Sequence, residues 1–243
     1  MTMGCLIRKD TMEFHLKAGD IIVDRNPFPT VDQTQVVTAS EGRRVLRNTY
    51  SLLAITLLFS AAMAWLSFAL GTRYISPIIF IVGAYGLMFL VHATARTGFG
   101  LVAILAFTGF MGYSLGPVLN MFMYARGGSS IVLLALSMTG VSFLGLSLVG
   151  IFTRRDLGFL GNFITVGVFV LLAGMIINLF VHASALSMVM CCGFILLSSA
   201  VILFRTQQIV RGGETNYILA TIDLYVSIYN IFVSLLQILN NRD

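Results

Sequence analysis

A regular row of polar side chains interrupts an apolar segment near the C-terminal end of the sequence. Its members recur at spacings of four, three, four and three residues: Asp223, Ser227, Asn230, Ser234 and Gln237. Side chains with these spacings lie on one face of an α-helix. If the helix spans a membrane, this face points inward, where it can bond neighbouring helices or line a wet path for protons or ions. We refer to these five residues as the polar stripe.

Asp223 is the member of the polar stripe best suited to chemistry, because it is the only acid within an apolar run. A carboxylate inside a membrane is costly to bury and is a functional candidate by default. Its expected partner is Arg205. If the chain turns around Gly212 and Gly213, the two residues lie within about three residues of the same depth, or ~4.5 Å along the helix axes. The pair could be a structural ion pair near the inner surface or part of a proton or ion relay.

Sets of residues typical of intramembrane enzymes are missing. A serine protease needs a histidine beside its nucleophile, and Ser147 in GLSLVG has none within the apolar runs. The histidines lie in the N-terminal segment or at the ends of runs: His15, His92 and His182. An aspartyl protease needs two acids, and only Asp223 is available. No zinc, haem or nucleotide motif occurs, so we expect no enzymatic activity, cofactor or bound metal.

The composition identifies the surroundings of these residues. Of the 243 residues, 58% are hydrophobic and 10% are charged, with a mean hydropathy of +0.93, whereas soluble domains carry roughly 25% charged residues. The basic residues are scattered over the N-terminal segment and the loops rather than gathered on one face, which argues against a nucleic-acid partner. The sequence therefore predicts an all-α membrane protein embedded in a lipid bilayer.

Apolar runs alternate with short polar breaks from Tyr50 onward and predict seven membrane spans in one bundle over 50–239. The spans lie near residues 50–70, 77–91, 100–122, 131–152, 160–181, 185–204 and 217–239. The break at 181–184 is the weakest, so one long bent helix in place of the fifth and sixth spans stays open. The polar stripe predicts that the seventh span lies in the middle of the bundle.

Residues 1–49 have a different composition and predict a polar N-terminal tail. They contain seven of the fifteen basic residues and six of the ten acids. Cytoplasmic loops are enriched in Lys and Arg, and with the tail inside the basic residues of the loops divide eight to three. The inner side then holds Arg43, Arg44, Arg47, Arg96, Arg154, Arg155, Arg205 and Arg211, and the outer side holds Arg73, Arg126 and Arg242. We expect a cytoplasmic N-terminus and a periplasmic C-terminus.

Small residues in the third and fourth spans predict close helix packing, since helices in membranes associate through such residues. The third span has Gly109, Gly112 and Gly116, followed by Pro117, whose ring removes one backbone hydrogen bond and bends the helix. The fourth span has Gly140, Gly145 and Gly150. The bend at Pro117 could open a cavity.

Four segments carry a resemblance to a known family: VLRNTYSLL, GAYGLMFL, FTGFMGYSLGPVLN and GGETNYILATIDLYVSIYNIFVSLLQIL. Over residues 44–239 the chain resembles the transmembrane Bax inhibitor motif proteins, and among them the bacterial YccA-like branch of FtsH-protease modulators. The third segment contains the glycines and the proline that we take as the family signature: Gly109, Gly112, Gly116 and Pro117. The resemblance implies six helices arranged around a central seventh.

One branch of that family resembles pH-sensitive calcium leak channels, gated by an aromatic-Asp motif near the end of helix six and a Leu-Tyr-x-Asp motif in helix seven. The matching positions here read Phe204-Arg205-Thr206 and Leu224-Tyr225-Val226-Ser227. An arginine and a serine therefore replace the two carboxylates, and a cation at the gate would repel calcium. Our candidates for a central polar or ion pathway are Arg205, Asp223, Ser227 and Asn230.

The YccA-like branch implies a different role, as membrane substrates and modulators of the FtsH quality-control protease. Such proteins engage the protease through a cytoplasmic N-terminal tail, and the polar segment 1–49 fits that role. We therefore expect a non-enzymatic inner-membrane protein that binds and modulates an FtsH-type AAA protease and is also its substrate. The alternative is a pH-sensitive leak of calcium or protons through the bundle.

Overall fold

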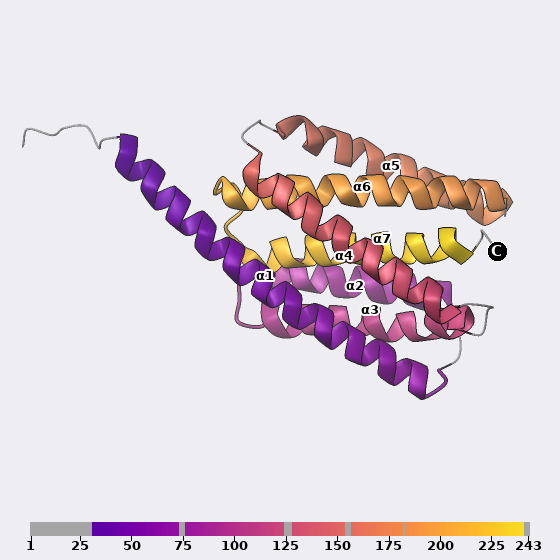
Figure 1. The fold of residues 1–243 in the computed structure, drawn as a ribbon. Helices are drawn as coiled ribbons and strands as arrows, with labels where there is room; N and C mark the ends of the chain where they lie inside the picture. The colour runs from indigo at the N-terminus through magenta and orange to yellow at the C-terminus, as the bar shows by residue number, and fades with distance from the viewer. Residues whose placement is uncertain (1–30, 73–75, 124–127, 154–156, 182, 241–243) are drawn as a thin grey trace, which may run out of the picture.

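The computed structural model describes residues 31–72, 76–123, 128–153, 157–181 and 183–240. Within these ranges the chain forms seven α-helices and no strand (Figure 1). The helices are α1 (Val31–Ala69), α2 (Pro77–Thr94), α3 (Gly100–Met123), α4 (Gly128–Phe152), α5 (Gly158–Val181), α6 (Ser184–Val210) and α7 (Tyr217–Asn240). Six of them are long and apolar enough to cross a membrane, and α2 is apolar but shorter. The predicted all-helical membrane fold is confirmed.

The fifth and sixth spans are separate helices. Helix α5 ends at Val181, and Ala183 has an extended backbone, with φ −82° and ψ 124°, before α6 begins at Ser184. An extended residue cannot continue a helix. The alternative of one long bent helix is therefore wrong.

Helix α1 begins at Val31, well inside the segment predicted as a polar tail. Its 39 residues span ~58 Å, about twice the thickness of a hydrocarbon core, and its N-terminal part projects beyond the bundle (Figure 1). Gly42 and Thr49 are buried, so residues from 42 to 49 pack as part of the bundle. The polar composition did not predict the helical backbone conformation of residues 31–49. Residues 1–30 of the tail lie outside the described residues.

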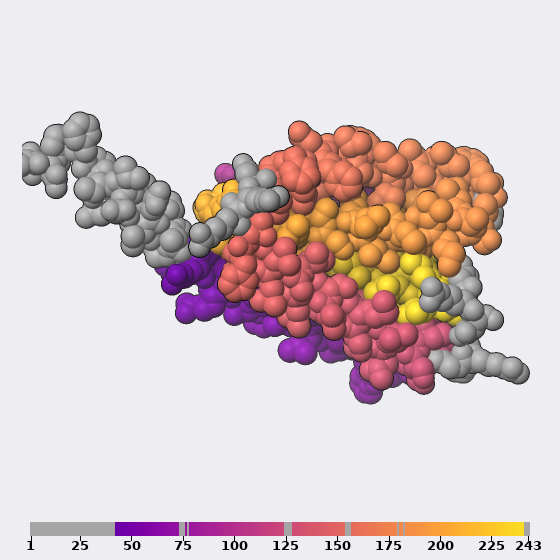
Figure 2. Space-filling view, turned by 45° about the horizontal axis from the view of Figure 1, so that its top comes forward, coloured from indigo at the N-terminus to yellow at the C-terminus, as the bar shows by residue number. Residues whose placement is uncertain are grey.

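Helix α7 forms the centre of the bundle, as the polar stripe predicts. It packs against α1, α3, α4 and α6, whereas α2 packs mainly on α3 and α5 on α6. Leu224, Ile231 and Leu236 on α7 have at most 1% of their surface exposed. Four helices therefore flank α7 directly, and α2 and α5 form the periphery. In Figure 2 atoms of α7 are visible between α4 and α6.

Helices α1 and α3 approach each other through small residues on both sides. A methyl group added at Gly112 would collide with the backbone carbonyl of Ser60, and one added at Gly116 would collide with the Ser67 side chain. Ala64 lies between these two serines on α1 and is 4% exposed. Small residues on α1 thus face small residues on α3, and the packing interpretation is confirmed for this pair of helices.

Replacing Gly112 by alanine is expected to destabilise the bundle by about 1 to 3 kcal/mol, because the added methyl group must push a backbone atom of α1. Gly86→Ala is the matched control, since an added methyl group there meets no atom within 4 Å. Thermal unfolding in detergent measures both variants. Equal stability of the two variants would show that α1 can move away from α3 without loss.

The other glycines predicted to mediate packing differ in whether a neighbouring helix lies against them. A methyl group added at Gly109 would lie 2.8 Å from the Phe59 ring, and one at Gly150 would lie 2.9 Å from Thr206 on α6. Gly140 and Gly145, however, face open space. The packing interpretation is therefore wrong for these two glycines, because the absence of a side chain permits close approach but does not require it.

Candidate functional site

The turn between α6 and α7 brings Arg205 and Asp223 to the same depth. Helix α6 ends with Gly212 in the left-handed region, at φ 75°. The Gly213 N–H donates to the carbonyl of Gln208 at 2.9 Å, and the Gly212 N–H donates to that of Ile209 at 3.1 Å. These two bonds form a Schellman motif, which satisfies the last carbonyls of a helix and needs glycine at its left-handed position. The sequence GG at 212–213 thus reverses the chain where the sequence analysis placed the turn.

Asn216 and Glu214 fix the start of α7 after this turn. Glu214 Oε1 accepts the N–H of Asn216 at 2.9 Å. The side-chain oxygen of Asn216 accepts the N–H of Ile218 at 3.0 Å, which caps the helix, while its amide donates to the carbonyl of Ala95 at 3.0 Å. The segment between α2 and α3 is therefore tied to the same end of the bundle as the turn between α6 and α7.

The predicted ion pair is present in the structure. Arg205 Nη2 lies 2.7 Å from Asp223 Oδ2. Arg205 Nη1 donates to Gln208 Oε1 at 2.9 Å and lies 3.7 Å from Glu214 Oε2. The side chains of Arg205, Asp223 and Glu214 are 31%, 16% and 18% exposed. One guanidinium thus contacts two carboxylates at the edge of the bundle. We call Arg205, Asp223 and Glu214 the charged cluster.

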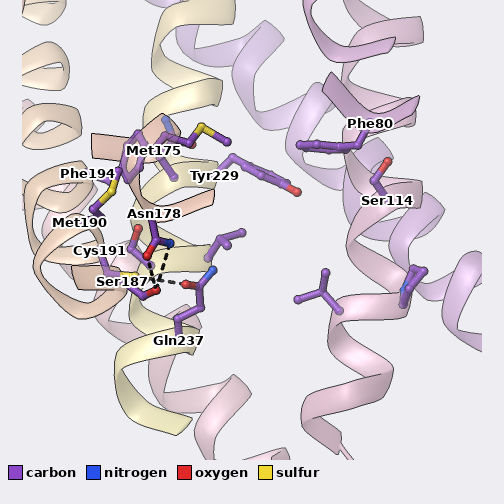
Figure 3. Close-up of a pocket in the computed structure, with 15 residues that line it drawn as sticks. Phe80, Ser114, Met175, Asn178, Ser187, Met190, Cys191, Phe194, Tyr229 and Gln237 are labelled. Carbon is purple, nitrogen blue, oxygen red and sulfur yellow. Dashed lines mark hydrogen bonds between the residues drawn. The ribbon is translucent and has the colours of Figure 1, made fainter. Parts of the chain in front are cut away.

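A cavity of about 410 Å³ lies toward the opposite end of α7. Three members of the polar stripe line it: Asn230, Ser234 and Gln237. Pro117 on α3 also lines it. Figure 3 shows that the Tyr229 hydroxyl points across the cavity toward Phe80 and Ser114.

Hydrogen bonds join polar side chains of α5, α6 and α7 on one wall of this cavity (Figure 3). The Asn178 amide donates to Ser187 Oγ at 3.1 Å, and the Cys191 thiol donates to Gln237 Oε1 at 3.2 Å. Asn178 and Ser187 were not predicted from the sequence, because a single polar residue in an apolar run forms no periodic pattern. The wall is polar enough to hold water, since several donors and acceptors face a space larger than one water molecule.

The four candidate pathway residues fall into two separate places. Arg205 and Asp223 belong to the charged cluster, and Asn230 lines the cavity, whose lining includes none of the other three. Ser227 is 3% exposed, and its hydroxyl donates to the backbone carbonyl of Asp223 at 2.7 Å. Its side chain is thus used within α7 and does not connect the charged cluster to the cavity.

Aromatic side chains fill the layer between the charged cluster and the cavity. The hydroxyls of Tyr225 and Ser60 are 2.6 Å apart, and the Tyr225 ring packs edge-on against Phe107 with centroids 6.0 Å apart. Tyr229 stacks against Tyr225 at 6.4 Å.

Among the described residues, no group of three or more His, Cys, Asp or Glu side chains could hold a metal ion.

Comparison with known proteins agrees with this architecture. The model of the family described as inhibitor of apoptosis-promoting Bax1 matches residues 42–243. An uncharacterized protein of Pseudomonas aeruginosa is 50% identical over 203 residues, which cover 84% of this chain and 91% of that protein. The Escherichia coli K12 protein named modulator of FtsH protease YccA is 46% identical over 217 residues, or 89% of this chain and 97% of the relative. A protein of another Escherichia coli strain, named inner membrane protein YccA, matches with the same identity and coverage.

Proposed function

The chain belongs to the Bax inhibitor family, and we propose that it is a non-enzymatic inner-membrane protein that binds and modulates an FtsH-type protease. The observation that carries this proposal is the 46% identity over 97% of the length of a relative named a modulator of FtsH protease. The proposal includes a second role for the chain as a substrate of the protease, gripped through its N-terminal segment.

The shape of α1 supports this proposal. Its first turns project from the bundle (Figure 1), so Val31 lies at a distance from the packed helices. Chain ends are preferred sites of proteolytic attack when they are not tied down by packing. A protease that extracts membrane helices could engage such an end without first opening the bundle.

The exposed basic residues support a cytoplasmic position for that end. Arg43, Arg44 and Arg47 are exposed on α1, and Arg96 is exposed between α2 and α3. These positions share the end of the bundle that carries the turn between α6 and α7. A methyl group added at Gly42 would lie 2.9 Å from the carbonyl oxygen of Val210, and Asn216 bonds to the segment between α2 and α3. A basic end is expected on the cytoplasmic side, which leaves the C-terminus in the periplasm. Several other counted residues, Arg73, Arg126, Arg154, Arg155 and Arg242, lie outside the described residues.

Co-purification from native bacterial membranes tests the proposed function. The tagged chain is expected to retain FtsH after mild detergent extraction, and its overproduction is expected to slow the degradation of an independent membrane substrate of FtsH. An unrelated seven-helix membrane protein produced at the same level is the control. Failure to retain the protease, together with unchanged degradation of the second substrate, would reject the proposal.

A leak of ions through the bundle is the second candidate function, and the cavity beside α7 favours it. Polar side chains line that cavity, and polar groups inside a membrane bundle often mark ion paths. Two features oppose it: Arg205 places a cation at the other end of the stripe, and Ser227 is bonded within its own helix. A pH-dependent cation flux into liposomes that contain the purified chain would support this second function.

A further inference from the structure

A second hollow lies between α1 and α4, on a floor formed by α3 and α7. Its volume is about 650 Å³, and it is lined almost entirely by apolar side chains. The α1 wall includes Leu57, Ala61 and Trp65, and the α4 wall includes Leu136 and Gly140. We call this hollow the lateral groove.

Three polar side chains of the lateral groove are bonded inside the protein, and the Tyr229 hydroxyl points into the other cavity (Figure 3). The Ser60 hydroxyl is bonded to that of Tyr225 at 2.6 Å, and the Thr139 hydroxyl donates to the carbonyl of Ala135 at 2.7 Å. These hydroxyls therefore need no hydrogen-bond partner from the occupant. An apolar occupant fits, because it buries hydrocarbon surface without breaking a hydrogen bond.

The groove is closed at one end. The rings of Tyr50 on α1 and Phe143 on α4 are in contact there, with centroids 5.8 Å apart. From Leu57 to Phe68, the residues that line the groove on α1 cover eleven steps of the helix, or ~16 Å. This length is about half of a hydrocarbon core of ~30 Å. The groove thus runs from the middle of the membrane to one surface only.

Trp65 lies in the part of the groove nearer that surface and is 70% exposed. Tryptophan is enriched where the hydrocarbon of a bilayer meets its headgroups. A transmembrane helix of a partner would need a path along the whole membrane and a width of ~10 Å, and the contact between Tyr50 and Phe143 blocks that path. A single acyl chain is slender and belongs to one leaflet only.

We propose that the lateral groove binds one acyl chain of a phospholipid from the leaflet at the C-terminal end of the bundle. The chain lies between α1 and α4 with its terminal methyl group toward Tyr50 and Phe143, and the headgroup lies near Trp65. The occupant fills the space beside Gly140, where an added methyl group would meet no side chain and no neighbouring helix within 4 Å.

The chain offers a built-in probe and a matched pair of variants for a test. Trp65 is the only tryptophan, so all tryptophan fluorescence comes from the wall of the groove. Gly140 and Gly145 both lie on α4, are exposed, and face open space, but only Gly140 lines the groove. Gly140→Leu should fill the groove, and Gly145→Leu should add the same side chain outside it. Ala61→Leu fills the groove from the opposite wall and serves as the second variant if Gly140→Leu does not fold.

The experiment titrates the purified full chain in detergent with a phosphatidylethanolamine that carries brominated acyl chains, which quench tryptophan. The original chain and Gly145→Leu are expected to show saturable quenching at about one lipid per protein. In Gly140→Leu and Ala61→Leu the affinity for the lipid should fall about tenfold or more, because the added side chain overpacks the site. Quenching that rises in proportion to the lipid fraction and is equal in all four proteins would overturn the proposal. Dissociation of an oligomer by the two groove variants, without a change in quenching, would instead assign the groove to a second copy of the chain.

Discussion

Deletion of residues 1–30 is expected to leave the bundle folded and to slow its degradation by FtsH several-fold. The deletion ends where α1 begins, at Val31, so it keeps every residue that the structure describes. If the protease must grip a chain end before it can extract helices, the shortened chain presents only a helix that is continuous with the first span. The half-life after arrest of protein synthesis, in membranes that contain FtsH and in membranes that lack it, measures the effect.

A longer deletion distinguishes loss of the segment that the protease grips from loss of the fold. Residues 42–49 include the buried Gly42, where an added methyl group would lie 2.9 Å from the carbonyl oxygen of Val210, and the fully buried Thr49. Deletion of residues 1–49 should therefore lower the unfolding temperature, whereas deletion of 1–30 should not. An unrelated polar segment of equal length fused before Val31 should restore rapid degradation. If deletion of 1–30 leaves the half-life unchanged, the protease does not enter through this end, and the inferred position of the N-terminus loses its functional support.

The membrane made much of this fold predictable from the sequence. Backbone groups in lipid must be satisfied within each segment, so an apolar run of sufficient length has to be a helix. For the same reason the polar stripe had to face inward, and it placed α7 at the centre. The start of α1 was not predictable in this way, because outside the membrane a polar segment can be helical or not.

The sequence predicted the contacts of the candidate site that depend on how deep each residue lies along its helix. It did not predict the contacts that depend on loop conformation. The depths of Arg205 and Asp223 follow from counting residues on either side of Gly212, so their contact was expected. Glu214 joins them only because the Schellman motif directs the chain back over α6. The lateral groove left no signal in the sequence, since the open space beside Gly140 depends on how far α4 stands from α1.

The charges of the cluster predict an unequal effect of removing its members. Arg205→Gln removes the guanidinium that contacts both Asp223 and Glu214, whereas Asp223→Asn leaves Arg205 with Glu214 and with the Gln208 side chain. A lone buried charge costs about 3 to 5 kcal/mol, and the partial exposure of these side chains places the loss for Arg205→Gln near the lower limit, at about 3 kcal/mol. The loss for Asp223→Asn should be smaller. Unfolding free energies measured in one detergent compare the two variants.

The double variant decides whether Arg205 and Asp223 act as one unit. Once Arg205 is absent, Asp223→Asn removes an unpaired carboxylate, so the second substitution should restore stability instead of reducing it further. We expect the double variant to deviate from additivity by at least ~1 kcal/mol, well beyond the ~0.5 kcal/mol typical of independent sites. If Arg205 instead extends to the headgroups in the bilayer, the two effects would add within that margin. Glu214→Gln is the control, because at 3.7 Å from Arg205 Nη1 it should couple to Arg205 more weakly than Asp223 does at 2.7 Å.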